Sequence, residues 1–75
     1  MKYSIYEAIF IGEKTRHFSP KDRRLIEVER YGNECGRILN VREKGKVRAQ
    51  MYFYSETEFE ACWQVVETIT EEKYE

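Results

Sequence analysis

The stretch "SETEFEACWQVVETITEEKYE", residues 55–75, decides the fold predicted from this sequence. Ser55 is followed three residues later by Glu58, the spacing of a capping box in which a hydroxyl and a carboxylate satisfy free backbone N–H groups. Apolar side chains then recur at steps of three and four residues: Phe59, Cys62, Trp63, Val66 and Ile69. This period predicts a C-terminal amphipathic helix with one stripe against a sheet.

The preceding stretch, "KVRAQMYFYS" at residues 46–55, alternates apolar and polar side chains. A period of two indicates a β-strand with one face against a core. The apolar face consists of Val47, Ala49, Met51 and Phe53. Gly45 should form a tight turn that joins this strand to the one before it as a hairpin.

Three further strands are expected at residues 2–11, 24–30 and 37–43. The first is apolar on both faces, which favours an interior place in the sheet, and the polar loop 12–23 is long enough to let it cross there. The inward residues expected in the other two strands are Ile26 and Val28, then Leu39 and Val41.

Together these elements predict an α+β fold of the order ββββα: a four-stranded antiparallel sheet with one C-terminal amphipathic helix packed on one face. A chain of 75 residues has room for a single domain, 1–75, with a thin core. We expect Trp63, in the middle of the helical stripe, to anchor the helix to the sheet.

Charge is balanced overall but divided along the chain. The formal net charge is −1, so no general attraction to nucleic acid or membranes is expected. Residues 1–54 carry twelve Lys and Arg against seven Asp and Glu, whereas residues 55–75 carry one Lys against seven Glu. Because the sequence shows neither a membrane-length apolar run nor a secretion leader, we expect a cytoplasmic protein with no membrane partner. Cys35 and Cys62 lack the spacing of a metal or redox site and should be reduced thiols; the alternative is a single disulfide between them.

The sequence offers little for catalysis. His17 is the only histidine and lies in a polar loop, without a nucleophile in a triad-like arrangement. Glu60, Glu67 and Glu71 would share one side of the predicted helix, where a solvated acidic rim is the better interpretation than an acid–base or cation site. We expect no catalytic residue, no metal site and no cofactor, and therefore no enzyme.

The face of the sheet that the helix leaves uncovered is the candidate partner-binding site. Its expected members are Arg48, Gln50, Tyr52 and Tyr54 from strand 46–55, and Ile38, Asn40 and Arg42 from strand 37–43. Tyrosine with arginine is typical of binding hot spots, so this face should bind a protein partner or a second copy of the chain in a homodimer. The alternative is that these aromatics only stabilise the strands through cross-strand pairs.

A second hypothesis is single-stranded nucleic-acid binding. Loop 12–24 contains a group of candidate anion-binding residues: Lys14, Arg16, His17, Lys21, Arg23 and Arg24. They could neutralise phosphates while the tyrosines stack on bases. The predicted element order resembles that of the transcriptional coactivators that bind single strands, which are ββββα dimers. This likeness covers most of the chain and rests on topology alone.

We expect a small non-enzymatic protein-binding module that acts by surface occlusion, as a stoichiometric inhibitor or an adaptor. One form of this expectation is a phage-encoded protein that blocks a host defence or a host enzyme. It rests on small size and the lack of catalytic groups, and on no motif.

Overall fold

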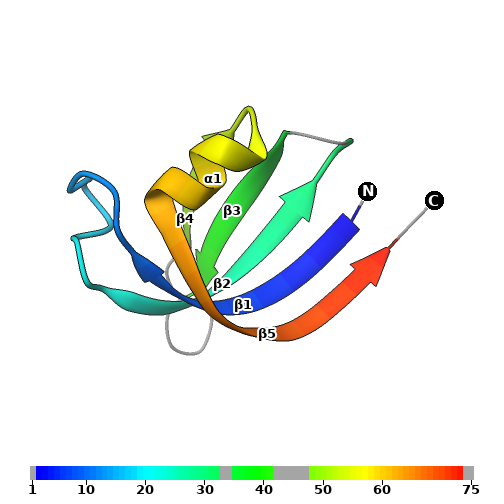
Figure 1. The fold of residues 1–75 in the computed structure, drawn as a ribbon, viewed down its shortest axis with the longest axis horizontal. Helices are drawn as coiled ribbons and strands as arrows, with labels where there is room; N and C mark the ends of the chain where they lie inside the picture. Colours follow the sequence, from blue (N-terminus) through cyan, green and yellow to red (C-terminus); the bar gives the residue numbers. More distant parts are fainter. Residues whose placement is uncertain (1, 33–34, 42–47, 74–75) are drawn as a thin grey trace.

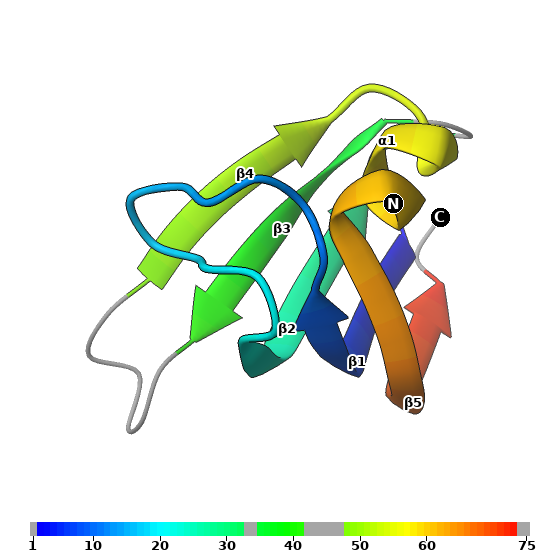
Figure 2. The same ribbon diagram turned by 60° about the vertical axis from the view of Figure 1, so that its left-hand side comes forward.

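Within residues 2–32, 35–41 and 48–73, which the computed structural model describes, five antiparallel strands form one strongly curved sheet with a single helix on its concave side (Figure 1). The elements along the chain are β1 (Lys2–Phe10), β2 (Arg23–Arg30), β3 (Gly36–Val41), β4 (Arg48–Phe53), α1 (Glu56–Cys62) and β5 (Trp63–Lys73). The strand order is β4-β3-β2-β1-β5, so β1 to β4 form a meander and β5 returns to the free side of β1. The loop between β1 and β2 lies on the same side of the sheet as α1 (Figure 2).

The α+β class with an antiparallel sheet and one helix is confirmed, but the predicted four-stranded ββββα order is wrong because a fifth strand is present. The helix ends at Cys62, and Trp63 already has extended backbone angles, φ −134° and ψ 134°. Five of the six residues 65–70 are Val, Ile or Thr, whose β-branched side chains disfavour a helix and favour a strand. The apolar spacing is therefore a helical signal only up to Trp63. The resulting order, ββββαβ, also differs from that of the ββββα coactivators.

The start of the helix follows the predicted capping box closely. Ser55 accepts a hydrogen bond from the backbone N–H of Glu58 at 3.2 Å. The Glu58 carboxylate reaches back to the N–H of Tyr54 at 2.8 Å, one residue before the cap. These bonds fix the point at which the chain leaves β4 and enters α1.

β1 lies inside the sheet, as its two apolar faces indicate, but it does not cross the meander. It is enclosed because β2 pairs with one of its edges and β5 with the other. The register with β5 shifts twice, between Ile5 and Tyr6 and between Glu7 and Ala8. Such shifts are the sign of β-bulges.

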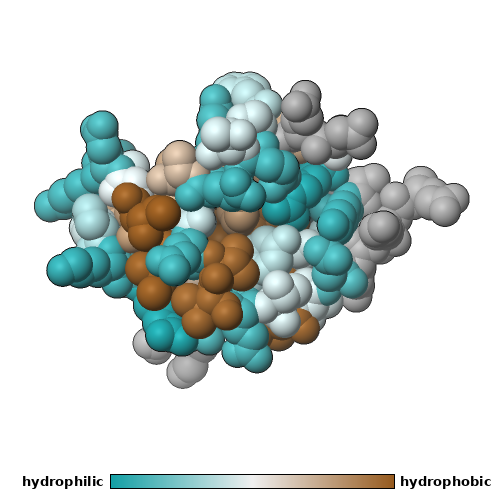
Figure 3. Space-filling model, in the orientation of Figure 1, coloured by the Kyte–Doolittle hydropathy of each residue, from teal (hydrophilic) through white to brown (hydrophobic). Residues whose placement is uncertain are grey.

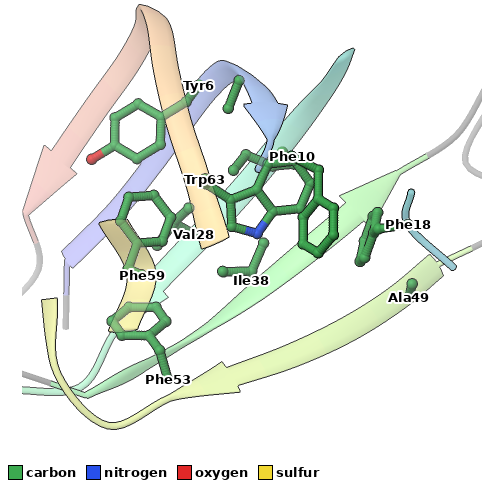
Figure 4. Packing of buried hydrophobic residues seen from close by; sticks show 11 residues of the cluster. Tyr6, Phe10, Phe18, Val28, Ile38, Ala49, Phe53, Phe59 and Trp63 are labelled. Atoms are coloured by element: carbon green, nitrogen blue, oxygen red, sulfur yellow. The ribbon is translucent and has the colours of Figure 1, made fainter. Parts of the chain in front are cut away.

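The core fills the concave side of the sheet. Its buried members are Tyr6, Ala8, Phe10, Phe18, Ile26, Val28, Ile38, Ala49, Phe53, Phe59 and Trp63 (Figure 4). The inward positions predicted for β2, and those of Ala49 and Phe53 in β4, are confirmed, and Met51 packs against the same cluster. Val47 lies outside the described residues.

The predicted inward face of β3 is wrong. Ile38, 1% exposed, points into the core opposite Val28, while Leu39 lies on the convex side, although it too is buried. Gly36 explains this phase: a Cβ there would collide with the carbonyl oxygen of Glu29 and would lie 2.6 Å from the ring of Phe53. A Cβ at position 36 would point at the buried ring of Phe53, so this position faces inward and only glycine fits there. Alternation along the strand then places Ile38 inward as well. The side chain of Val41 lies outside the described part of the chain.

Three aromatic rings join the end of β1, the loop after it and the start of β5. Ring centroids of Trp63 lie 5.1 Å from Phe10 and 5.0 Å from Phe18, and those of Phe10 and Phe18 are 5.5 Å apart. Both contacts of Trp63 are edge-to-face, the arrangement that aromatic pairs prefer. The burial expected for Trp63 is confirmed, but it anchors a strand as well as the helix. Phe18 was not predicted as a core residue.

The helix is held to the sheet by a half-buried charge. Arg30, at the end of β2, forms a bidentate ion pair with Glu56, with Nε–Oε2 at 2.6 Å and Nη2–Oε1 at 3.1 Å. Its Nη1 donates to the hydroxyl of Tyr6 at 3.0 Å. Burial opposes the charge of Arg30, but the hydrogen bonds to Glu56 and Tyr6 outweigh it and raise its pKa. The guanidinium also lies 5.4 to 5.9 Å from the ring centroids of Tyr6, Phe53 and Phe59, within the range of cation–π attraction.

Two alanine substitutions test the boundary between α1 and β5. Trp63→Ala should lower the free energy of unfolding by about 3–5 kcal/mol, because it removes a buried large aromatic side chain. Val66→Ala should change it by less than about 0.5 kcal/mol, because Val66 is 46% exposed in β5. Urea denaturation followed by circular dichroism measures both. A large loss for Val66→Ala would contradict the strand and favour a longer helix.

Candidate functional site

The convex side of the sheet carries exposed tyrosines at one end. Tyr31 follows β2, Tyr52 lies in β4 and Tyr54 follows β4, and their side chains are 47%, 58% and 75% exposed. Their neighbours include an ion pair between Glu29 and Arg37. We call this surface the tyrosine face and define it by its described members: Glu29, Tyr31, Arg37, Gln50, Tyr52 and Tyr54.

The strand register builds this face from four strands. Tyr3, Glu29, Arg37 and Tyr52 are consecutive cross-strand partners from β1 to β4. Directly opposite residues of antiparallel strands share one face of the sheet, with Cβ atoms about 4.5–5.5 Å apart. The row therefore has an ion pair in its middle and a tyrosine at each end.

One carboxylate oxygen of Glu29 organises the tyrosine face. Its Oε1 accepts a hydrogen bond from the Tyr31 hydroxyl at 2.8 Å, another from Arg37 Nε at 3.1 Å, and a third from Arg37 Nη2. The bond to Glu29 raises the pKa of Tyr31, and the same carboxylate raises the pKa of Arg37. The side chains of Tyr31 and Arg37 are thus held in fixed orientations, and groups ordered in advance lose less entropy when they form an interface.

The structure brings only part of the predicted partner-binding set together. Gln50 and Tyr52 are exposed on the convex side of β4, and Tyr54, directly after the strand, is exposed as well. Ile38 is not part of this surface, because it belongs to the core. Arg42 lies outside the described residues, and so do the side chains of Asn40 and Arg48.

Glu29, Tyr31 and Arg37 were missed by the sequence analysis, although the sequence contains a signal for them. With Ile26 and Val28 inward, alternation places Glu29 and Tyr31 outward. The turn cluster at 31–36 then makes Arg37 the cross-strand neighbour of Glu29. A row of opposite charges flanked by tyrosines follows from that pairing.

The loop between β1 and β2, which contains most of the predicted anion-binding residues, is anchored to the core and by hydrogen bonds of its own. Phe18 fixes it to the core, and Thr15 Oγ1 accepts hydrogen bonds from the N–H groups of His17 and Phe18. Residues 19–22 form a turn in which Lys21 has φ 77°, the left-handed value that a type II turn requires.

The six predicted anion-binding residues are not equally free to bind. Those with exposed side chains and no ion pair among the described residues are Lys14, Arg16, His17 and Lys21. Arg23 pairs with Glu7 and Arg24 with Asp22. The loop adjoins Phe10, whereas the tyrosine face adjoins Tyr3, seven residues away along β1, which is about 23 Å. The loop and the tyrosines therefore lie at opposite ends of the sheet.

The acidic residues do not converge. Glu60 lies on α1. Glu67, on β5, lies opposite Glu7 of β1, and Glu71, also on β5, forms an ion pair with Lys2 at 3.2 Å. The prediction that these three glutamates share one helix side is therefore wrong, because residues 63–73 form a strand. In the described ranges, no three His, Cys, Asp or Glu side chains are arranged to hold a metal ion.

Both cysteines are free thiols. Cys35 is exposed, and Cys62 is half-buried at the end of α1. Burial, and to a lesser extent the charge of Glu58, raise the pKa of Cys62. A raised pKa keeps this side chain a thiol, whereas a nucleophilic cysteine needs a lowered one.

Two grooves flank α1. The groove between α1 and β5, about 520 Å³, is lined by Tyr6, Ile11, Arg30, Glu56, Phe59, Glu60, Trp63, Gln64, Val65 and Thr68. The groove between α1 and β4, about 280 Å³, is lined by Ile38, Met51, Tyr52, Phe53, Glu58, Phe59, Ala61 and Cys62. Apolar atoms also gather over the first half of β5 and the end of β1 (Figure 3). The exposed apolar residues of this region are Ile11, Val65, Val66 and Ile69.

No family model, no curated protein and no solved structure matches this chain. None of the helices in its described part is long and apolar enough to cross a membrane.

The hydrogen bond between Tyr31 and Glu29 predicts a distinct pH dependence. The ordinary pKa of tyrosine is 10.0, and that of Tyr31 is raised in the folded protein. The bond's stabilising contribution is therefore complete below pH 10 and is lost as the pH rises through the folded pKa of Tyr31. NMR titration of the Tyr31 Cζ signal should show ionisation above pH 10, and Glu29→Gln should move it down toward 10. A Tyr31 that titrates at or below pH 10 in the parent would rule out this bond in solution.

Proposed function

We propose that this protein is a small non-enzymatic protein-binding module that acts by covering a surface of its partner, as a stoichiometric inhibitor or an adaptor. The observation that carries the proposal is the tyrosine face: three exposed tyrosines around an Arg37–Glu29 ion pair, on the side of the sheet opposite the core.

The composition of this face suits recognition of another protein. Tyrosine provides a large contact area with few rotatable bonds, and arginine provides several donors, which is why both are enriched among hot spots. Tyr31, Tyr52 and Tyr54 do not belong to the concave core. A standard interface buries about 800 Å² on each partner, a small share of the 5287 Å² of accessible surface of this chain.

Other observations are consistent with a binder in a reducing compartment. Both thiols are free, the usual state of cysteine in the cytoplasm. In the described residues no three His, Cys, Asp or Glu side chains are arranged to hold a metal ion, which is consistent with action by occupancy of a surface. A phage-encoded protein that blocks a host defence or a host enzyme would be one instance of this class, and a homodimer through the same face would be another use of it.

Single-stranded nucleic-acid binding is the alternative. Its strongest support is the group of exposed cations on the loop, Lys14, Arg16 and Lys21. The separation of the loop from the tyrosines weighs against it, because a bound strand would have to run the length of the sheet to use both. Arg23 is paired with Glu7 and Arg24 with Asp22, which further reduces the positive charge that the loop has free for a phosphate.

The test of the proposal is partner capture by a double variant. Tyr31→Ala combined with Tyr54→Ala should leave the melting temperature within a few degrees of the parent, because both side chains are exposed. Capture of a partner, identified by co-purification and mass spectrometry and then measured with the purified protein, should weaken at least tenfold, since hot-spot tyrosines contribute about 2 kcal/mol or more each. Leu25→Ala is the matched control: it removes an exposed apolar side chain, 54% exposed, at the far end of β2.

Two results would contradict the proposal. Equal loss of binding in Leu25→Ala and in the double variant would show that the tyrosine face has no special role. Retention of the parent on single-stranded DNA resin at about 150 mM salt, with release by Arg16→Ala/Lys21→Ala, would favour the nucleic-acid alternative, because phosphate contacts weaken steeply as salt rises.

A further inference from the structure

The two edges of the sheet are not equally protected. On β5, the register with β1 shifts twice, and Glu67 and Glu71 add charge along the strand. Bulges and charges are the means by which proteins prevent an edge strand from pairing with another chain. On β4, the register with β3 is regular over all six residues, and residues 49–53 carry no charge. The edge of β4, the outermost strand in Figure 2, is therefore the open one.

A groove lies beside this edge. Its apolar lining consists of Ile38, Met51 and Phe53 from β3 and β4, and Phe59, Ala61 and Cys62 from α1. Tyr52 and Glu58 also line the groove, and the space is about 280 Å³. The edge and the groove together offer backbone groups for pairing and a pocket for alternate side chains, the two parts of a strand-addition site.

One charge marks the rim of the groove. Glu58 is exposed, and one of its oxygens accepts the N–H of Tyr54, while the other has no partner among the described residues. Arg48, the first residue of β4, is the one basic residue of this strand, and it lies at the end away from Glu58. Residues 49–62 contain no Lys or Arg, so the sequence beside Glu58 supplies no cation to pair with it. A second copy joined edge to edge through β4 would bring its own Arg48, so self-pairing is the competing occupant that the test has to separate. The charge of Glu58 favours an incoming strand with a basic side chain at this end.

We propose that β4 accepts an extended segment of a partner polypeptide as an additional strand. Apolar side chains at alternate positions of the segment enter the groove beside α1, and a neighbouring Lys or Arg pairs with Glu58. The remaining side chains fall on the convex side next to Gln50 and Tyr52 and continue the tyrosine face. The inference rests on the proposed function in that the partner is a protein, and it adds the conformation and charge of the segment that is recognised.

The probe for this inference is a display library of random twelve-residue peptides, selected on the immobilised protein. Selected peptides should contain apolar residues at alternate positions with a Lys or Arg nearby. Added to the isotope-labelled protein, a selected peptide should shift the backbone amide signals of residues 49–53 and 58–62 more than those of β5.

Matched variants locate the site. Ala61→Arg places a long side chain in the groove from an exposed helix position and should weaken peptide binding at least tenfold. Thr57→Arg adds the same charge and bulk to an exposed position of α1 that does not line the groove, and should leave binding unchanged. Glu58→Gln keeps the acceptor for Tyr54 but removes the charge, so it should weaken peptides that contain Lys or Arg more than versions of them with Gln.

Several outcomes would overturn the inference: no selected peptides, amide shifts confined to β5, unchanged binding by Ala61→Arg, or a dimer of this chain formed through β4. These outcomes are separate from a failure of the proposed function, because Tyr31 and Tyr54 do not line the groove. If Ala61→Arg retains the partner while the Tyr31/Tyr54 variant loses it, the proposed function stands and the strand-addition site is wrong.

Discussion

The contact of Trp63 with Phe10 and Phe18 is the constraint on which the rest of this fold depends. Trp63 caps the C-terminus of α1 and is also the first residue of β5, so burial of its ring fixes where the helix ends and the strand begins. Pairing of Phe10 with Trp63 opens the β1–β5 ladder, and the N–H of Ile11 donates to the carbonyl of Cys62 beside it. The same rings hold the loop through Phe18. Helix end, strand start and loop position are therefore set by one aromatic cluster.

The position of α1 in turn determines which surfaces are available for binding. Arg30 holds the helix over the concave side through its ion pair with Glu56. Its guanidinium is half-buried among aromatic rings, and the two bonds to Glu56 and the bond to the Tyr6 hydroxyl compensate for the hydration that it loses. Phe59 of this helix lines both grooves. The Arg30–Glu56 ion pair lines the groove at β5 and not the groove at β4, so the first is the more polar of the two. Because the pair holds α1 on the concave side, the convex side stays uncovered.

Much of this arrangement could be predicted from the sequence, and each failure has a physical reason. Alternation correctly placed Ile26, Val28 and Phe53 inward, and the Ser55 cap was found because its signal is local. The fifth strand was missed because Val66 and Ile69 continue the helical spacing of apolar residues past Trp63, although most residues of this stretch are β-branched. The phase of β3 could not come from its own apolar residues, since Ile38 and Leu39 are adjacent and both become buried. The close packing of a ring on Gly36 decides it, and that contact joins residues far apart in the sequence.

In the candidate site, too, local signals were found and features that depend on strand pairing were missed. Tyr52 and Tyr54 were predicted because they continue the alternation of residues 46–55, whereas Glu29 and Arg37 required knowledge of which strands pair.

The anchored loop between β1 and β2 can change its sequence without changing the fold. Phe18 and the turns at Thr15 and Ser19–Asp22 fix the path of the chain, and none of these contacts involves the side chains of Lys14, Arg16 or His17 beyond the His17–Phe18 ring contact. Substitutions at those three positions should therefore leave the scaffold intact. The loop is a site where new sequences could be grafted, by mutation or by design, while the fold beneath it stays the same.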